Sequence, residues 1–185
     1  SLEPMLALGR GLAQGRVTGI SATGYIKSMS HTAAVNIGLL FGLKGRVIPS
    51  ASACTSSSQA IGFAYEAIRY GKQTVMIAGG SDELTFCSAA VFDTLFATSL
   101  RNDFPATSPR PFDRDRDGLV LGEGGAALIL EEREHALARG ARIYAEIIGF
   151  GTNSDGAHVT QPQMETMADT MRLALEDAEL RPEAI

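Results

Sequence analysis

Residues 47–62 read Val-Ile-Pro-Ser-Ala-Ser-Ala-Cys-Thr-Ser-Ser-Ser-Gln-Ala-Ile-Gly, which predicts a short strand, a tight turn of small residues and a helix beginning at Cys54. Backbone N–H groups in the first turn of a helix lack intrahelical partners and carry partial positive charge. Such a position favours the thiolate, the nucleophilic form of cysteine. A buried cysteine acting as a small hydrophobic side chain is the alternative. Position alone leaves both interpretations open.

The composition is that of an ordinary globular domain, with 185 residues, 45% hydrophobic and 20% charged. The net charge of −5 argues against general nucleic-acid binding. We expect no membrane insertion, because no apolar run is long enough to span a bilayer. The two cysteines, Cys54 and Cys87, form neither a disulfide framework nor a metal-binding pattern, and no signal peptide is visible. We therefore expect a cytoplasmic protein, with Cys87 as a core thiol.

Strand and helix patterns alternate along the chain, which predicts an α/β layered fold. The apolar runs at 74–78 and 125–130 are typical of strands covered on both faces. We expect a turn at 79–81, and loops at 15–26 and 101–118. Further strands are expected at 46–50 and 143–150, and helices at 4–14, 29–42, from Cys54 to Gly71, and at 84–97, 131–139 and 165–179.

Two other features of the sequence are candidate binding sites. Asp113 to Gly118 is similar to the opening of a calcium-binding loop, but the required acid is replaced by Gly124, with Glu123 one residue early. Salt bridges that pin the long loop are the better interpretation. Among the histidines, His135 lies in a charged helix, whereas His158 lies in a loop and is the best functional candidate.

The chain resembles the β-ketoacyl-acyl carrier protein synthases, condensing enzymes of the thiolase superfamily. The resemblance implies part of the layered αβαβα thiolase-like fold, with residues 1–140 as a segment of the N-terminal half and 141–185 as the beginning of the C-terminal half. It rests on five segments in one order: 52–56 (SACTS), 78–83 (AGGSDE), 110–118 (RPFDRDRDG), 122–126 (GEGGA) and 144–156 (YAEIIG followed by SDG).

The resemblance also implies a function, a 3-oxoacyl-[acyl-carrier-protein] synthase that condenses an acyl thioester with malonyl-acyl carrier protein in fatty acid elongation. Cys54 matches the acyl-accepting nucleophile, whose backbone N–H forms half of the oxyanion hole. No metal or cofactor is implied beyond the phosphopantetheine of the carrier protein, and the parent enzyme would be a homodimer. The implied substrate-binding residues are Met29, Phe92, Leu119 (commonly Phe in the family), His158, Thr160 and Pro162, and candidate carrier-protein contacts are Arg16, Lys27 and Arg101.

Three alternatives stay open: a modular polyketide ketosynthase segment, a non-catalytic partner subunit, and a thiolase-like enzyme acting on acyl-coenzyme A. The family supplies two histidines and a lysine from its second half, and none of the three histidines here matches those positions. We therefore expect the chain by itself not to condense substrates. We also expect it to expose apolar helix faces and a sheet edge.

Overall fold

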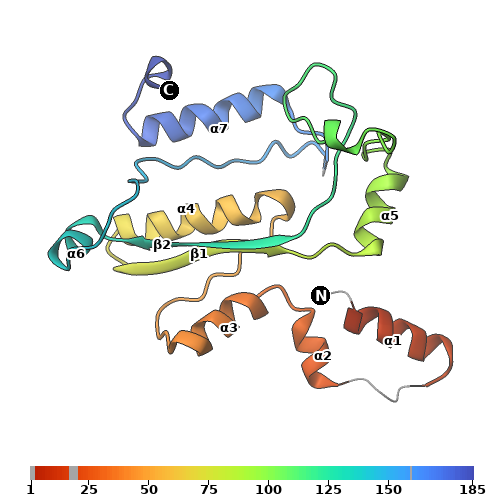
Figure 1. Cartoon of the computed structure of the whole chain (residues 1–185). Helices are drawn as coiled ribbons and strands as arrows, with labels where there is room; N and C mark the ends of the chain where they lie inside the picture. Colours follow the sequence, from red (N-terminus) through yellow and green to blue (C-terminus); the bar gives the residue numbers. More distant parts are fainter. Residues whose placement is uncertain (1–2, 17–20, 159) are drawn as a thin grey trace. The chain divides into compact units, whose positions relative to one another are not determined.

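The computed structural model of the chain describes residues 3–16, 21–158 and 160–185. It divides into two compact units, one drawn from residues 1–32 and 81–126 and the other from 33–80 and 127–185. The helices and strands, labelled in Figure 1, are α1 (Glu3–Ala13), α2 (Ala22–Lys27), α3 (Thr32–Phe41), α4 (Ser56–Arg69), β1 (Val75–Asp82), α5 (Phe86–Thr94), β2 (Gly124–Glu131), α6 (Arg133–Ala138) and α7 (Met164–Asp177).

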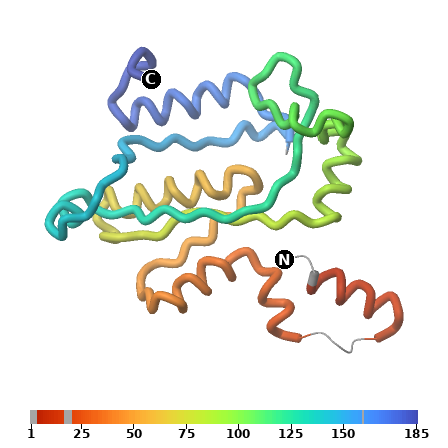
Figure 2. Tube along the Cα trace, in the orientation of Figure 1, coloured from red at the N-terminus to blue at the C-terminus, as the bar shows by residue number. Residues whose placement is uncertain are grey.

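The second unit is layered. Strand β1 pairs with β2, helix α4 lies against this sheet, and the extended segment 141–155 runs between α4 and α7 (Figures 1 and 2). Glycines permit the close approach of these layers. A Cβ atom on Gly149 would lie 2.4 Å from the Ala174 carbonyl oxygen, and one on Gly151 would lie 2.5 Å from the Thr170 carbonyl oxygen. Gly149 and Gly151 therefore let α7 contact the backbone of the segment directly.

Local hydrogen bonds explain where several helices begin. Thr85 and Ser88 form a capping box at the start of α5, each side chain accepting a backbone N–H of the other. The Glu132 carboxylate caps α6 by accepting the N–H groups of Glu134 and His135. These side chains satisfy donors that the first turn of a helix leaves unpaired.

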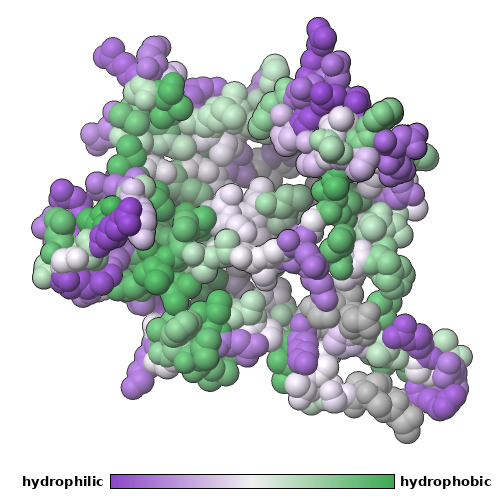
Figure 3. All heavy atoms as spheres, in the orientation of Figure 1, coloured by the Kyte–Doolittle hydropathy of each residue, from purple (hydrophilic) through white to green (hydrophobic). Residues whose placement is uncertain are grey.

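The buried core of the described residues consists of small side chains. Ala64 and Ala67 on α4, Ala78 on β1 and Ala136 on α6 are the described hydrophobic residues that are buried. The expectation that both strands are covered on two faces is therefore wrong for this chain, since β2 has no buried residue. Large apolar side chains remain exposed, as expected. Figure 3 shows hydrophobic residues gathered over α3, where Leu39, Leu40 and Phe41 are each more than half exposed.

The structure differs from the sequence-based prediction in four places. Helix α2 begins within the expected loop at 15–26, and β1 continues through the turn expected at 79–81. Residues 46–50 and 143–150 are not strands, because neither segment pairs with another strand among the described residues. A strand depends on hydrogen bonds to a neighbour, so apolar character alone does not create one.

Among the described helices, none has both the length and the apolar character needed to cross a membrane.

Candidate active site

Cys54 lies at the start of the helix that the sequence predicted. It occupies a single 3₁₀ turn, Ala53–Thr55, that leads directly into α4, and its side chain is exposed. The preceding residue, Ala53, has a φ of 50°. This left-handed conformation is unfavourable for a residue with a Cβ atom and persists only where surrounding contacts enforce it. The thiol is thus presented on a strained turn at a helix N-terminus.

Hydroxyl groups close this turn around Cys54. The Ser56 hydroxyl donates to the Ala53 carbonyl oxygen at 2.7 Å and accepts the Ser52 N–H at 2.9 Å. The Thr55 hydroxyl donates to the Ser52 carbonyl oxygen at 2.9 Å, and the Ser50 hydroxyl donates to the Ser56 carbonyl oxygen at 2.9 Å. These individual bonds were not predicted, although the density of serine and threonine around Cys54 is a signal that could have revealed them.

A glycine on β1 sets the position of the first turn of α4. A Cβ atom on Gly80 would lie 2.0 Å from the Ser57 hydroxyl oxygen. A larger residue at position 80 would require the Ser57 hydroxyl to move, and its Cβ atom would still lie 3.2 Å from the Ser57 Cβ atom. Gly80 therefore serves close packing within a strand rather than the turn that its sequence context suggested.

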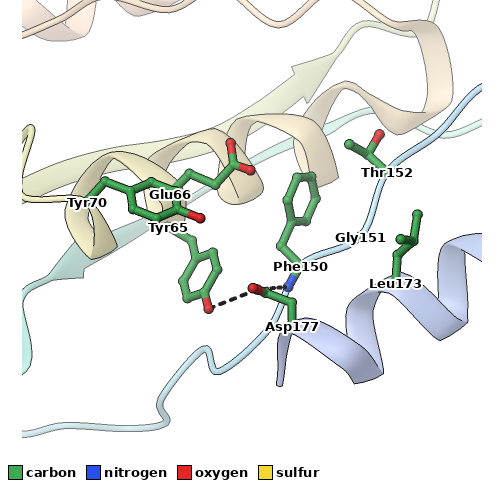
Figure 4. A pocket seen from close by; sticks show the side chains of 8 residues that line it. All are labelled: Tyr65, Glu66, Tyr70, Phe150, Gly151, Thr152, Leu173 and Asp177. Carbon is green, nitrogen blue, oxygen red and sulfur yellow. Dashed lines mark hydrogen bonds between the residues drawn. The ribbon is translucent and has the colours of Figure 1, made fainter. Parts of the chain in front are cut away.

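At the other end of α4, the Asp177 carboxylate joins three parts of the second unit. It accepts the Phe150 N–H at 3.0 Å and the Tyr65 hydroxyl at 3.1 Å, as Figure 4 shows. It also accepts the Arg69 guanidinium at 2.6 Å. The bond from the Phe150 N–H is the main cause that lowers the pKa of Asp177. Burial, followed by the bond to Asp177, raises the pKa of Tyr65. This cluster ties α4, the extended segment and α7 together.

Two shallow pockets flank the Phe150 ring in the same unit. One has a volume of about 260 Å³ and is lined by Tyr65, Glu66, Tyr70, Phe150, Gly151, Thr152, Leu173 and Asp177, as Figure 4 shows. The other has a volume of about 340 Å³ and is lined by Ser58, Ile61, Gly62, Ile147, Gly149, Phe150, Gly151 and Ala174. Neither pocket is lined by Cys54.

His135 and His158 make local contacts. His135 Nδ1 lies 2.5 Å from a carboxylate oxygen of Glu131. His158 Nδ1 accepts the Thr160 N–H at 3.1 Å, which places the proton of a neutral His158 ring on Nε2. Among the described residues, no histidine forms a hydrogen bond with the Cys54 thiol.

The predicted substrate-binding residues divide between the two units. His158, Thr160 and Pro162 belong to the second unit with Cys54, and their side chains are exposed. The first unit holds Met29, which is exposed, Phe92, which is half-buried, and Leu119, whose N–H donates to the Ala97 carbonyl oxygen. The roles assigned to these residues by resemblance stay predictions.

The three predicted carrier-protein contacts all lie in the first unit; they are Arg16, Lys27 and Arg101. Arg16 and Lys27 are exposed. Arg101 is half-buried, and it pairs with Asp117 at 3.3 Å and donates to the Asp115 carbonyl oxygen at 3.0 Å. Arg101 therefore already has an internal structural role, and a contact with a carrier protein stays a prediction for all three.

The long loop at 101–118 is pinned by ion pairs, as predicted. Arg110 lies 3.6 Å from Asp113, and Asp117 pairs with Arg101. Asp117 also accepts the Ser99 hydroxyl at 2.6 Å, and this bond is the main cause that lowers the pKa of Asp117. Among the described residues, no group of three or more His, Cys, Asp or Glu side chains is placed to hold a metal ion.

Comparisons with known proteins agree with this arrangement. The family model described as the β-ketoacyl synthase N-terminal domain matches residues 10–136. The 3-oxoacyl-[acyl-carrier-protein] synthase 2 of Vibrio cholerae is 43% identical over 155 residues, which cover 82% of this chain and 37% of the relative. The corresponding synthase 1 of Escherichia coli is 41% identical over 161 residues, which cover 85% of this chain and 40% of the relative.

Solved structures show the same fold. A β-ketoacyl synthase from Burkholderia phymatum matches with a TM-score of 0.95 and 60% identity, covering 100% of this chain and 45% of that one. A ketosynthase of a type II polyketide synthase, in complex with its acyl-carrier protein, matches with a TM-score of 0.85 and 34% identity, covering 96% and 46%. The chain spans less than half the length of these relatives. Its α/β fold is part of the layered thiolase-like fold, and the chain belongs to the β-ketoacyl synthase family, whose N-terminal domain it matches.

Proposed function

We propose that this chain carries the acyl-accepting site of a 3-oxoacyl-[acyl-carrier-protein] synthase, which condenses an acyl thioester with malonyl-acyl carrier protein in fatty acid elongation. The observation that carries the proposal is the exposed Cys54 thiol on a strained, hydroxyl-closed turn at the N-terminus of α4. The relatives that bear this synthase name, at 41% and 43% identity, support the same assignment.

The chemistry begins with the Cys54 thiolate. Its sulfur attacks the carbonyl carbon of the acyl thioester, and the bond to the donor sulfur breaks, so that the carrier's thiol leaves after taking up a proton. Negative charge develops on the carbonyl oxygen during the attack, and the Cys54 N–H stabilises it in the proposed site. Loss of CO₂ from the malonyl donor then supplies the carbon nucleophile that takes the acyl group and releases the Cys54 thiolate.

We propose an acyl carrier protein as the partner, a homodimer as the assembly and the cytoplasm as the location. One related ketosynthase structure is a complex with its acyl-carrier protein, which supports the proposed partner. The chain has a net charge of −5, so an acidic partner would require a local basic surface. Arg16, Lys27 and Arg101 are the proposed contributors. The retained, exposed Cys54 argues against a non-catalytic partner subunit.

The proposal is tested by acyl transfer to the purified protein, followed by mass spectrometry of the peptides that contain Cys54 and Cys87. We expect the acyl group on Cys54, no transfer in Cys54→Ala and unchanged transfer in the matched variant Cys87→Ala. An acyl group found on Cys87 alone, or on neither cysteine, overturns the proposal. Transfer from carrier protein is expected to weaken with added salt, whereas transfer from acyl-coenzyme A keeps its rate.

A further inference from the structure

Ser56 occupies a special place in the turn that presents Cys54. Its hydroxyl donates to the Ala53 carbonyl oxygen and accepts the Ser52 N–H, so it bridges the two residues before the nucleophile. Its backbone N–H also donates to the Ala53 carbonyl oxygen. One residue thus supplies bonds to the two residues that precede Cys54, while the Ser50 hydroxyl holds Ser56 through its own carbonyl oxygen.

Strain in the turn explains why such bonds are needed. Ala53 has a φ of 50°, and an alanine freed from its contacts returns to negative φ. That rotation would swing the Cys54 backbone, which immediately follows, away from the start of α4. The Ser52 N–H lies before the bond about which the Ala53 φ angle turns, and the Ala53 carbonyl oxygen lies after it. The same Ser56 hydroxyl binds both groups.

Resting on the proposed function, we propose that Ser56 is a positioning residue, which holds Ala53 in its left-handed conformation and thereby fixes the Cys54 thiol and N–H for attack on an acyl thioester. Ser56 does not touch the acyl group in this role. It acts through the geometry of Cys54, so its loss changes the rate of acyl transfer rather than the binding of the donor.

The experiment compares acyl transfer from a small acyl thioester with alkylation by iodoacetamide, at Cys54 and at Cys87 in the same protein. In Ser56→Ala we expect the saturating rate of acyl transfer to fall roughly ten- to a hundredfold, with an unchanged half-saturating concentration. Alkylation of Cys54 falls about two- to fivefold as the thiol leaves the helix N-terminus. Alkylation of Cys87 stays constant and serves as the internal reference.

Three variants separate positioning from a general loss of structure. Ser56→Thr keeps the hydroxyl and restores both rates. Ser58→Ala, two residues further along α4, leaves both rates unchanged. In Ala53→Gly the left-handed conformation carries no penalty, so adding Ser56→Ala to that variant costs much less than it does in the native background. This pair also preserves the test where Ser56→Ala alone fails to fold.

The outcomes distinguish this inference from the proposed function. The proposed function is refuted if the wild-type protein takes up no acyl group. If Cys54 alkylation nevertheless falls in Ser56→Ala, the role of Ser56 in holding the turn stands. The positioning role of Ser56 is refuted if acyl transfer is the same in Ser56→Ala and wild type. It is also refuted if Ser56→Ala reduces the rate equally with alanine and with glycine at position 53. The proposed function stands in both cases.

Discussion

Substitution of Asp177 tests whether the contact at the far end of α4 holds the second unit together. Its carboxylate accepts three donors, from Phe150, Tyr65 and Arg69. A bond from a backbone N–H to a charged group contributes about 1.5 kcal/mol and the Tyr65 bond about 1 kcal/mol. The Arg69 side chain is 40% exposed, so solvent screening makes its pair with Asp177 the smallest of the three contributions.

These contributions predict that Asp177→Ala destabilises the protein by about 3 kcal/mol, which lowers the melting temperature by about 6 to 12 °C at this chain length. Asp177→Asn keeps a carbonyl oxygen for the Phe150 N–H and is expected to lose about half as much. Thermal unfolding followed by circular dichroism measures the shifts, and hydrogen exchange at the Phe150 amide reports the local bond. Asp169→Asn is the control on the same helix, where Asp169 pairs with an exposed Arg172.

The pH dependence supplies an independent check on Asp177. Its pKa is lowered from 3.8, so its stabilising contribution is fully present above that value and is lost as pH falls through the lowered pKa. Tyr65 has a pKa raised above 10, so its contribution is present below pH 10 and is lost as pH rises further. The stability difference between wild type and Asp177→Asn should therefore shrink in acid. A difference that persists undiminished at low pH, or an Asp177→Ala variant that melts with wild type, refutes this account.

Further substitutions test three other parts of the structure. Gly62→Ala would place a Cβ atom 2.1 Å from the Phe150 ring and should destabilise the protein by about 1–3 kcal/mol. Gly38→Ala, in open space on α3, should stabilise it by about 0.5–1 kcal/mol. Equal melting temperatures for the two variants would contradict this expectation. The pKa of Glu131 is lowered to about 2, chiefly by hydrogen bonds from Arg139. The stability difference between wild type and Glu131→Gln should therefore be largest above pH 4.5 and vanish towards pH 2. A pH-independent difference in urea unfolding argues against this, and Glu134→Gln is the exposed control. Asp117→Asn should speed tryptic cleavage in the loop 101–118 more than Asp115→Asn, because Asp117 alone of the two carboxylates binds Ser99 and Leu100; equal cleavage rates rule this out.

Local sequence patterns predicted the parts of the site that depend on short-range interactions. The apolar spacing after Cys54 predicted α4, and the small residues before it predicted the turn, because helix periodicity and turn chemistry act over a few residues. The hydroxyl bonds of the turn also span at most six residues, so local sequence patterns could have predicted them.

Long-range contacts were beyond the sequence. Asp177 binds Tyr65 across 112 residues, and no periodicity in either helix indicates that pairing. The apolar residues at 143–150 predicted a strand, but strand pairing is a property of two segments, and the described residues offer this segment no strand partner. Gly80 was expected in a turn because glycine permits turns. In the structure its lack of a side chain instead makes room for Ser57, which packs against it.

The position of the nucleophile depends on close backbone approach more than on bulky packing. The buried core is built from alanines, two of them on α4. At its N-terminal end α4 meets Gly80, in its first half Gly62 meets the Phe150 ring, and at its C-terminal end Asp177 accepts bonds from Tyr65 and Arg69. These close contacts leave little room for added side chains, because a Cβ atom at Gly62 would meet the Phe150 ring and one at Gly80 would meet the Ser57 hydroxyl. Small shifts along α4 would therefore reach the turn at Ala53, whose strained φ angle leaves the presentation of Cys54 dependent on the Ser56 hydroxyl.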